Sequence, residues 1–189
     1  MSLIIDLQAV DAFAAWAHRG QKRNTGDATA PELPYIVHPR AVRQILEAEH
    51  PDPKMSEPWV LAVALLHDVL EDCDVHHREL SERFGEQVSA AVRALSKEMK
   101  AVPEARKTDD QYWAVLAQSP LAVRQIKAAD RIDNLRSCQK WPRPRLATKY
   151  LVETPAKVLP MIVDDPFLFE LLTRELLVIE RGYGHLRQP

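Results

Sequence analysis

The 189-residue sequence contains only two cysteines, Cys73 and Cys138, and only five glycines. Two cysteines are too few for the disulfide framework of a small secreted protein, so we expect a reduced, cytoplasmic chain. So few glycines, beside many helix-forming residues, argue against a turn-rich β architecture. No apolar run is long enough to span a bilayer, and the first residues show no signal-peptide pattern. The sequence therefore predicts an all-α protein outside the membrane.

The sequence also lacks an excess of positive charge. Its 25 Lys and Arg residues stand against 27 Asp and Glu residues, for a formal net charge of -2. Because nucleic-acid binding usually needs a basic surface, we expect no nucleic-acid partner, and any anionic ligand must be held by a local cluster of donors. The length suits one domain over residues 1–189 with a full core, and the oligomeric state is left open.

Apolar residues recur at helical spacing along most of the chain. We expect an all-α bundle of roughly eight to ten helices, with boundaries good to a few residues. Residues 21–34 are polar and broken by Gly and Pro, which predicts a loop, and residues 98–109 predict a charged surface connection. The expected helices cover residues 6–18, 39–46, 59–72, 75–84, 86–97, 112–118, 121–137, 146–163 and 167–181.

Residues 59–72 combine an apolar run with a cluster of metal-binding and proton-carrying groups. On a continuous helix Glu71 lies over His67 and Asp72 over Asp68, in two columns about 100° apart. Acids placed close together in an apolar setting repel one another unless a cation neutralises them, so a divalent metal accounts for the cluster. The alternative is that the helix reaches the surface here and the acids are solvated, although acids at a helix C-terminus oppose the macrodipole.

Two residues elsewhere in the sequence become candidate metal ligands when they are considered together with this cluster. His38 stands at the start of an expected helix, where a lone histidine is usually a surface or capping residue. Asp130 turns the inward stripe of the 121–137 helix polar, and the simpler interpretation is a buried ion pair with Arg131. With the His67-Asp68 pair, they offer two imidazoles and two carboxylates, a set that suits Mn²⁺, Fe²⁺, Zn²⁺ or Mg²⁺ and hydrolytic chemistry.

Several blocks of the sequence, taken in order, resemble the HD metal-dependent phosphohydrolase superfamily. The adjacent His67-Asp68 is the signature that gives this superfamily its name. More narrowly, the sequence is similar to the hydrolase domain of the RelA/SpoT group and to its small single-domain alarmone hydrolases. The blocks that carry the resemblance are residues 17–26, 35–39, 65–72, 84–85, 96–97 and 127–136.

The resemblance implies a role for each matching residue. The residues that match the ligands of a single metal, commonly Mn²⁺, are His38, His67, Asp68 and Asp130. Glu71 and Asp72 match an acidic pair that activates or orients the attacking water. The residues implied in substrate binding are Arg23, Asn24, Thr25, Lys97, Lys127 and Asn134. The implied reaction removes the 3′-pyrophosphate from guanosine tetra- or pentaphosphate, which gives GDP or GTP and pyrophosphate, in a stand-alone hydrolase.

Departures from the family pattern fall mainly where the substrate would be recognised. Asn24 stands where the family usually has a second basic residue, residues 27–33 lengthen the loop, and Asp133 occupies a position where the longer enzymes often have His. They leave open an HD phosphohydrolase acting on another nucleotide, such as a deoxynucleoside monophosphate or NADPH. A third alternative is a non-catalytic HD scaffold that senses or binds a ligand, and the presence of every candidate metal ligand together with the acidic pair argues against it.

Overall fold

The computed structural model describes residues 4–24 and 32–183, and this part of the chain is built from helices, with one isolated bridge between Lys22 and Pro34. The prediction of an all-α fold is therefore confirmed. The α-helices are α1 (Leu7–Ala17), α2 (Val37–Gln44), α3 (Pro58–Leu66), α4 (Val69–Asp72), α5 (His77–Phe84), α6 (Glu86–Leu95), α7 (Asp109–Gln118), α8 (Leu121–Lys140), α9 (Pro144–Glu153) and α10 (Pro166–Tyr183). None of the described helices is long and apolar enough to cross a bilayer.

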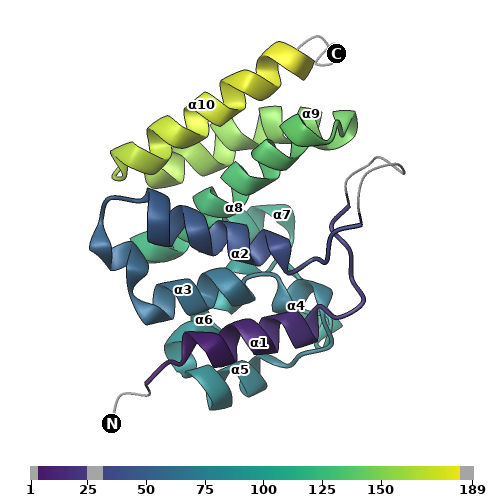
Figure 1. Cartoon of the computed structure of the whole chain (residues 1–189), viewed down its shortest axis with the longest axis vertical. Helices are drawn as coiled ribbons and strands as arrows, with labels where there is room; N and C mark the ends of the chain where they lie inside the picture. Colours follow the sequence, from purple (N-terminus) through teal and green to yellow (C-terminus); the bar gives the residue numbers. More distant parts are fainter. Residues whose placement is uncertain (1–3, 25–31, 184–189) are drawn as a thin grey trace.

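The helices are stacked along the long axis of the molecule (Figure 1). Helices α1 and α5 lie at one end, α9 and α10 at the other, and α2 and α3 between them. Helix α8 joins the two halves, because it packs against α2 and α3 on one side and α10 on the other. Residues from the N-terminal, middle and C-terminal parts of the sequence therefore meet along α8.

The centre of the core is α3, which is buried on every side. Its residues from Val60 to Leu66 are at most 1% exposed, and α1, α2, α6 and α8 all pack against it. A helix that is apolar all round is stable only where other elements cover it completely. The apolar run in the sequence is thus the axis of the core, and the polar residues that follow it begin inside the protein.

Local signals in the sequence set several helix ends. Asp6 Oδ1 accepts the backbone N–H of Gln8 at 2.9 Å and caps α1, and Thr108 and Gln111 form a capping box at the start of α7. Helix α5 ends at Gly85, whose φ of 91° lies in the region that favours glycine. These signals confirm the predicted break between the helices on either side of Gly85.

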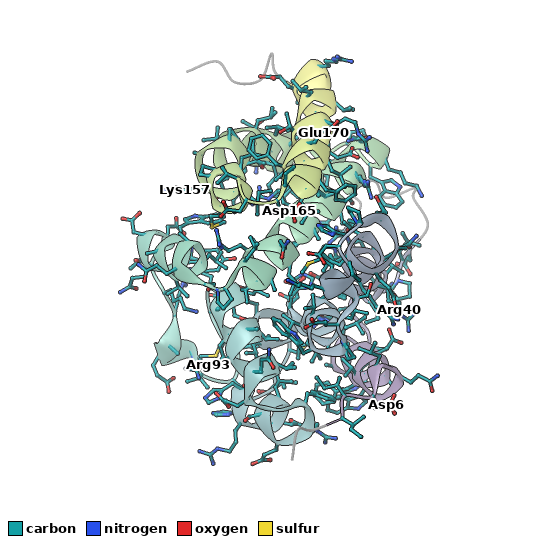
Figure 2. The ribbon with its side chains drawn as sticks, turned by 90° about the vertical axis from the view of Figure 1, so that its left-hand side faces the viewer. Asp6, Arg40, Arg93, Lys157, Asp165 and Glu170 are labelled. Carbon is teal, nitrogen blue, oxygen red and sulfur yellow. The ribbon has the colours of Figure 1, made fainter. Side chains whose placement is uncertain are left out.

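Asp165 connects the start of α10 to the rest of the fold (Figure 2). Its Oδ1 accepts the backbone N–H of Leu168 at 2.9 Å, while its Oδ2 accepts from His50 Nε2 at 2.8 Å and Gln125 Nε2 at 2.6 Å. The cap of α10 is therefore also the point where the η1 turn (Ile45–Glu49) and α8 are joined to it through side chains. Such a satisfied buried network fixes the position of α10 against α8.

Two predicted helices differ from the structure by more than a few residues at their ends. The helix expected over residues 59–72 is interrupted after Leu66, and the helix expected over residues 146–163 ends as α9 at Glu153. After Glu153 the chain continues through a π-helical turn (Thr154–Val158) and a 3₁₀ turn (Leu159–Ile162). Pro155 and Pro160 fall in these turns, and the missing N–H of proline is incompatible with a regular α-helical interior.

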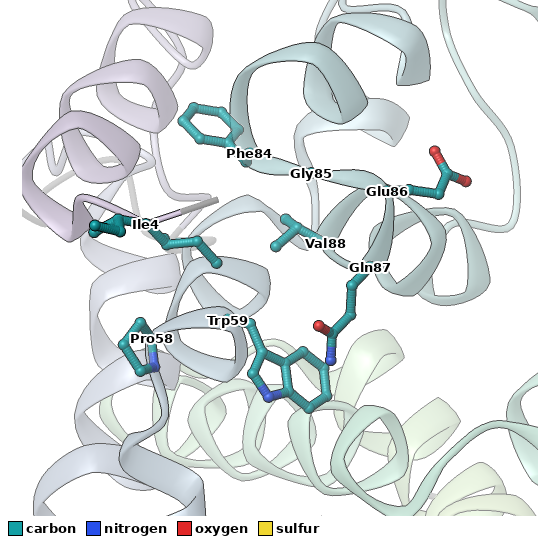
Figure 3. A pocket seen from close by; sticks show the side chains of 9 residues that line it. Ile4, Pro58, Trp59, Phe84, Gly85, Glu86, Gln87 and Val88 are labelled. Atoms are coloured by element: carbon teal, nitrogen blue, oxygen red, sulfur yellow. The ribbon is translucent and has the colours of Figure 1, made fainter. Parts of the chain in front are cut away.

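A cavity of about 450 Å³ lies beside the N-terminal end of α3 (Figure 3). It is lined by Ile4, Pro58 and Trp59 and by the α5–α6 junction around Gly85. The polar residues that follow α3 begin at the opposite end of this helix, and none of them lines this cavity.

We expect Leu61→Ala to lower the free energy of unfolding by about 2–5 kcal/mol, because it removes buried methyl groups from a helix that cannot collapse around the void. Leu61 is 1% exposed, whereas Leu177 on α10 is 47% exposed and provides a matched control. Urea unfolding followed by circular dichroism measures the difference. Equal losses in Leu61→Ala and Leu177→Ala would contradict the central position of α3.

Candidate metal centre and active site

The chain breaks between α3 and α4 at His67-Asp68, where the sequence analysis expected a continuous helix. The His67 side chain makes a 2.8 Å contact from Nδ1 to the carbonyl oxygen of Ala64. In an unbroken helix that carbonyl receives the N–H of Asp68, so the imidazole competes directly with the helical hydrogen bond. The expected continuous helix is therefore wrong, and His67-Asp68 forms a turn inside the protein. Helix α4 begins directly after it, and the backbone N–H of Asp72 still donates to the carbonyl oxygen of Asp68 at 2.9 Å.

Four side chains from three separate parts of the fold converge at this turn. His38 Nε2 of α2 lies 3.5 Å from Asp68 Oδ2 and 3.2 Å from Asp130 Oδ1 of α8. His67 Nε2 lies 3.1 Å from Asp68 Oδ2 and 3.8 Å from Asp130 Oδ1. Ligand atoms of His38, His67 and Asp68 all lie within 4.8 Å of one another, a spacing that fits a single metal ion.

The second nitrogen of each imidazole fixes which nitrogen faces the cluster. His67 Nδ1 is bonded to a backbone carbonyl, which can only accept, so this nitrogen carries a proton. His38 Nδ1 lies 2.6 Å from Asp133 Oδ2, a carboxylate that likewise accepts. Both Nε2 atoms are therefore directed at the acids, which is the arrangement found where histidine binds a metal.

The side-chain atoms of the cluster are suited to bind a divalent cation. His67 Nε2 is fully buried and, despite its neighbours, forms no well-directed hydrogen bond. Asp68 and Asp130 place two carboxylates beside it in a largely buried site. A buried nitrogen without a partner and two adjacent acids are all compensated when one cation binds between them.

The pKa directions show how strongly these groups depend on one another. Burial would lower the pKa of the His67 imidazole, but the charges of Asp68 and Asp130 raise it well above its ordinary value. Burial would raise the pKa of both carboxyls, but the imidazoles, together with Lys127 beside Asp130, hold the pKa of each below its usual range. Opposite charges thus stabilise the cluster, and a cation would take over that role.

Further hydrogen bonds hold the two carboxylates in place. The Tyr35 hydroxyl donates to Asp68 Oδ2 at 2.6 Å, and Lys127 Nζ donates to Asp130 Oδ2 at 2.8 Å. Asn134 Nδ2 donates to Asp130 Oδ1 at 2.6 Å. The alternative of a pair between Asp130 and its neighbour Arg131 is wrong, since Arg131 bonds to Glu153 at 3.0 Å instead.

The side chains of Glu71 and Asp72 lie in different environments beside the cluster. Glu71 Oε1 accepts the backbone N–H of Lys97, and Glu71 lines a cavity of about 160 Å³ with Lys97, Lys127 and others. Asp72 lies near the charge of Asp68 and near the hydroxyl group of Tyr35. Burial raises the pKa of both carboxyls, and the charge of Asp68 adds to the rise at each.

The residues expected to contact substrate are spread over several environments. Lys97 and Lys127 line the 160 Å³ cavity, although Lys97 Nζ also pairs with Asp109. Arg23 is buried, and Asn134 is bonded to Asp130. Thr25 lies outside the described residues.

Asn24 lines a separate groove of about 740 Å³ on the other side of Lys149. The remaining lining residues come from the turn before α9 and from the first half of α9, and they include Arg143 and Arg145. Arg143 Nη1 donates to the carbonyl oxygen of Asn24 at 2.8 Å. Because Lys149 lines both this groove and the 160 Å³ cavity, the two form neighbouring parts of one cationic region.

From the sequence, Tyr35 has no predicted role, and Asp133 stands out only as a departure from the family pattern. Tyr35 stands three residues before His38, and Asp133 three residues after Asp130, so each lies one helical turn from a member of the cluster. That spacing is the sequence signal from which both residues could have been identified. The contact between His38 and Asp133 was not visible, because the two residues are 95 positions apart.

An all-helical fold with a His-Asp turn and a second histidine and aspartate brought to it defines a class of metal-dependent domain. Residues 11–154 match the HD-domain family, so the chain belongs to that family. An HD hydrolase domain implies a divalent metal, and His38, His67 and Asp68 form its candidate site here.

Within this family the chain is similar to proteins named guanosine-3′,5′-bis(diphosphate) 3′-pyrophosphohydrolase. It is 36% identical to MESH1 of Homo sapiens over 134 residues, covering 71% of this chain and 69% of MESH1. It is also 36% identical to the Vibrio cholerae protein over 125 residues, covering 64% of this chain and 16% of that protein. The chain thus spans a small fraction of the long bacterial relatives and about two thirds of MESH1.

A solved structure shares the whole fold. It is described as a metazoan ortholog of SpoT that hydrolyses ppGpp, and it superposes with a TM-score of 0.71 at 27% sequence identity. The match covers 96% of this chain and 97% of that one. The shared architecture therefore includes α10, which lies beyond the residues that match the family.

We expect the protein to take up one Mn²⁺ ion and to be stabilised by about 2.7 kcal/mol when free Mn²⁺ is 100-fold above its Kd. His67→Asn should abolish this gain, because it removes the buried Nε2 ligand. His76→Asn is the matched control, since His76 is exposed at the N-cap of α5, where asparagine is also favoured. Elemental analysis and thermal unfolding with and without Mn²⁺ provide the measurements. Stoichiometric Mn²⁺ in His67→Asn would place the ion elsewhere.

Proposed function

We propose that this protein is a metal-dependent 3′-pyrophosphohydrolase of guanosine tetra- or pentaphosphate. Water adds to the phosphorus attached to the ribose 3′-oxygen, the bond between that phosphorus and the 3′-oxygen breaks, and the products are GDP or GTP and pyrophosphate. The observation that carries the proposal is the convergence of His38, His67, Asp68 and Asp130 beside Glu71 and Asp72. The similarity to MESH1 supports the choice of substrate.

We propose Mn²⁺, one ion per chain, as the cofactor, with the two Nε2 atoms and the carboxylates of Asp68 and Asp130 as its ligands. The mixed nitrogen and oxygen set without thiolate supports this choice. When bound, the cation supplies Lewis-acid activation of water and neutralises charge on the phosphoryl group. Tyr35 donates to Asp68 Oδ2, the oxygen that also faces the two Nε2 atoms, and Lys127 donates to Asp130 Oδ2, the oxygen that does not, so that these ligands keep their orientation.

Glu71 and Asp72 are proposed to handle protons. The attacking water must lose a proton, and the ribose 3′-oxygen must gain one as it leaves. Because burial raises the pKa of both carboxyls, each is a stronger proton acceptor than an exposed acid. The bond from the Lys97 backbone holds Glu71 at the edge of the 160 Å³ cavity.

That cavity is proposed to receive the transferred phosphates. Lys97, Lys127, Arg131 and Lys149 line it together with the acids Glu71, Asp109 and Glu153. The four cations outnumber these acids and are proposed to bind the pyrophosphate group. The groove beyond Lys149, with Arg143 and Arg145, is proposed to continue along the nucleotide. Asn134, like Asn24 at the groove, is retained as a proposed substrate contact.

We also propose the domain organisation and the location in the cell that the sequence predicts. A single domain over residues 1–189 is supported by the continuous packing of α1 to α10 around α3 and α8. A cytoplasmic location is supported by the two cysteines, which are buried and free.

The Mn²⁺-loaded protein is expected to release pyrophosphate from guanosine tetraphosphate, and to do so faster than it attacks other nucleotides. A panel with deoxynucleoside monophosphates and NADPH, analysed by chromatography, measures the preference. The panel is needed because Asn24 replaces a usual basic residue. Intact guanosine tetraphosphate alongside confirmed metal occupancy would count against the proposed substrate, and turnover of no nucleotide would favour a binding module.

The double variant Glu71→Gln plus Asp72→Asn should keep its metal but lose at least about 10²-fold in kcat, because both proton-carrying groups become neutral amides. The matched control is Asp164→Asn plus Glu170→Gln, which neutralises two exposed acids at the start of α10. Steady-state kinetics at saturating Mn²⁺ with elemental analysis give the result. Undiminished kcat in the first double variant would refute the proposed proton transfer.

A further inference from the structure

Arg23 is a buried cation in a segment that was expected to face the nucleotide. The residue is 9% exposed, and its backbone N–H donates to the carbonyl oxygen of Leu33 at 2.8 Å, which fixes the base of the loop. A buried guanidinium is stable only when carboxylates or carbonyl oxygens surround it. The position of its partners therefore shows whether the Arg23 side chain supports the metal ligands or faces the nucleotide.

Both partners of Arg23 lie directly behind a proposed metal ligand. Arg23 Nη2 donates to Asp133 Oδ2 and to Asn134 Oδ1, each at 2.9 Å. Asp133 Oδ2 in turn receives the Nδ1 proton of His38 at 2.6 Å, and Asn134 Nδ2 donates to Asp130 Oδ1 at 2.6 Å. One guanidinium thus begins two short chains of hydrogen bonds, which end at His38 and at Asp130.

We propose that Arg23 and Asp133 are positioning residues of the metal site and that Arg23 acts through its ligands rather than on the nucleotide. Asp133 holds His38 with Nδ1 protonated and Nε2 directed at the cation. Arg23 holds Asp133 and orients the Asn134 amide, so that its NH₂ group meets Asp130. We call this set of three residues, Arg23, Asp133 and Asn134, the ligand clamp.

The clamp has a direct consequence for metal affinity. A carboxylate that accepts the second ring proton of a ligating histidine fixes its tautomer and raises its basicity, and loss of such a partner typically weakens metal binding by about 10–100-fold. In this chain the carboxylate is Asp133, at the position where the longer enzymes often have His. The orientation of His38 is therefore set by a residue that departs from the family pattern.

The inference rests on the proposed metal site, but its main test does not require the proposed reaction. Mn²⁺ affinity at a fixed pH is measured by chelator competition for the wild-type protein, Asp133→Asn and Arg23→Gln. We expect Mn²⁺ Kd to rise by about 10–100-fold in both variants. At saturating Mn²⁺, the KM of each variant for guanosine tetraphosphate should equal that of the wild type, because the two residues that are varied, Arg23 and Asp133, do not touch the nucleotide in this proposal.

The matched control is Glu175→Gln. Glu175 of α10 is a buried carboxylate that pairs with Arg136 of α8 at 3.1 Å and has no bond to a proposed ligand. Its loss should change thermal stability without changing Mn²⁺ Kd. Should Arg23→Gln fail to fold, as judged by circular dichroism, Asp133→Asn and Arg23→Lys carry the test.

Two results would overturn the clamp. The first is an unchanged Mn²⁺ Kd in folded Asp133→Asn. The second is an Arg23 variant with unchanged Mn²⁺ Kd but a raised KM at saturating metal, which would show that Arg23 binds the nucleotide. If the wild-type protein binds Mn²⁺ but hydrolyses no guanosine tetraphosphate, the proposed function fails while the comparison of Mn²⁺ Kd still decides the clamp.

Discussion

Ionisable side chains placed at the end of a fully buried helix must find compensation inside the protein, and most of the features around the site follow from this constraint. Helix α3 carries His67 and Asp68 into the interior because every side of it is covered. A buried carboxylate or imidazolium without partners is costly, so the neighbouring elements supply donors and acceptors. Tyr35 donates to Asp68, and Lys127 and Asn134 donate to Asp130, while His67 Nε2 is buried without a hydrogen-bond partner and is thereby suited to bind a cation.

The same constraint explains why the site depends on the packing of the core. Its four candidate ligands come from α2, from the turn after α3 and from α8, and these elements are held together by contacts along α3. A shift of any one of them would move a ligand relative to the others, and a metal site tolerates little displacement. Stability and function are therefore coupled through α3, even though its apolar residues do not contact the cluster as ligands.

Membership of the HD-domain family accounts for the metal core more completely than for the surroundings. The residues behind the ligands, above all Asp133 and Arg23, differ in type or in contact from what the family resemblance implied. Asp133 provides the carboxylate for His38, and Arg23 is engaged by Asp133 and Asn134. The cationic region around Lys149 and Arg143 is then left as the part of the structure best placed to distinguish one nucleotide from another.

The sequence alone determined the helical class, the limits of α1 to within a residue and the break at Gly85, because these follow from periodicity, glycine and local motifs. It also named the four candidate ligands, through their residue types taken together and the family resemblance. The tertiary structure decided how the polar groups pair. His67 bonds to Ala64 and breaks the expected helix, Asp130 pairs with Lys127 and Asn134 instead of Arg131, and Asp133 reaches His38 across 95 positions. Periodicity tells which face of a helix turns inward, but the partner on that face depends on the distance and orientation of another helix, which only the packed core sets.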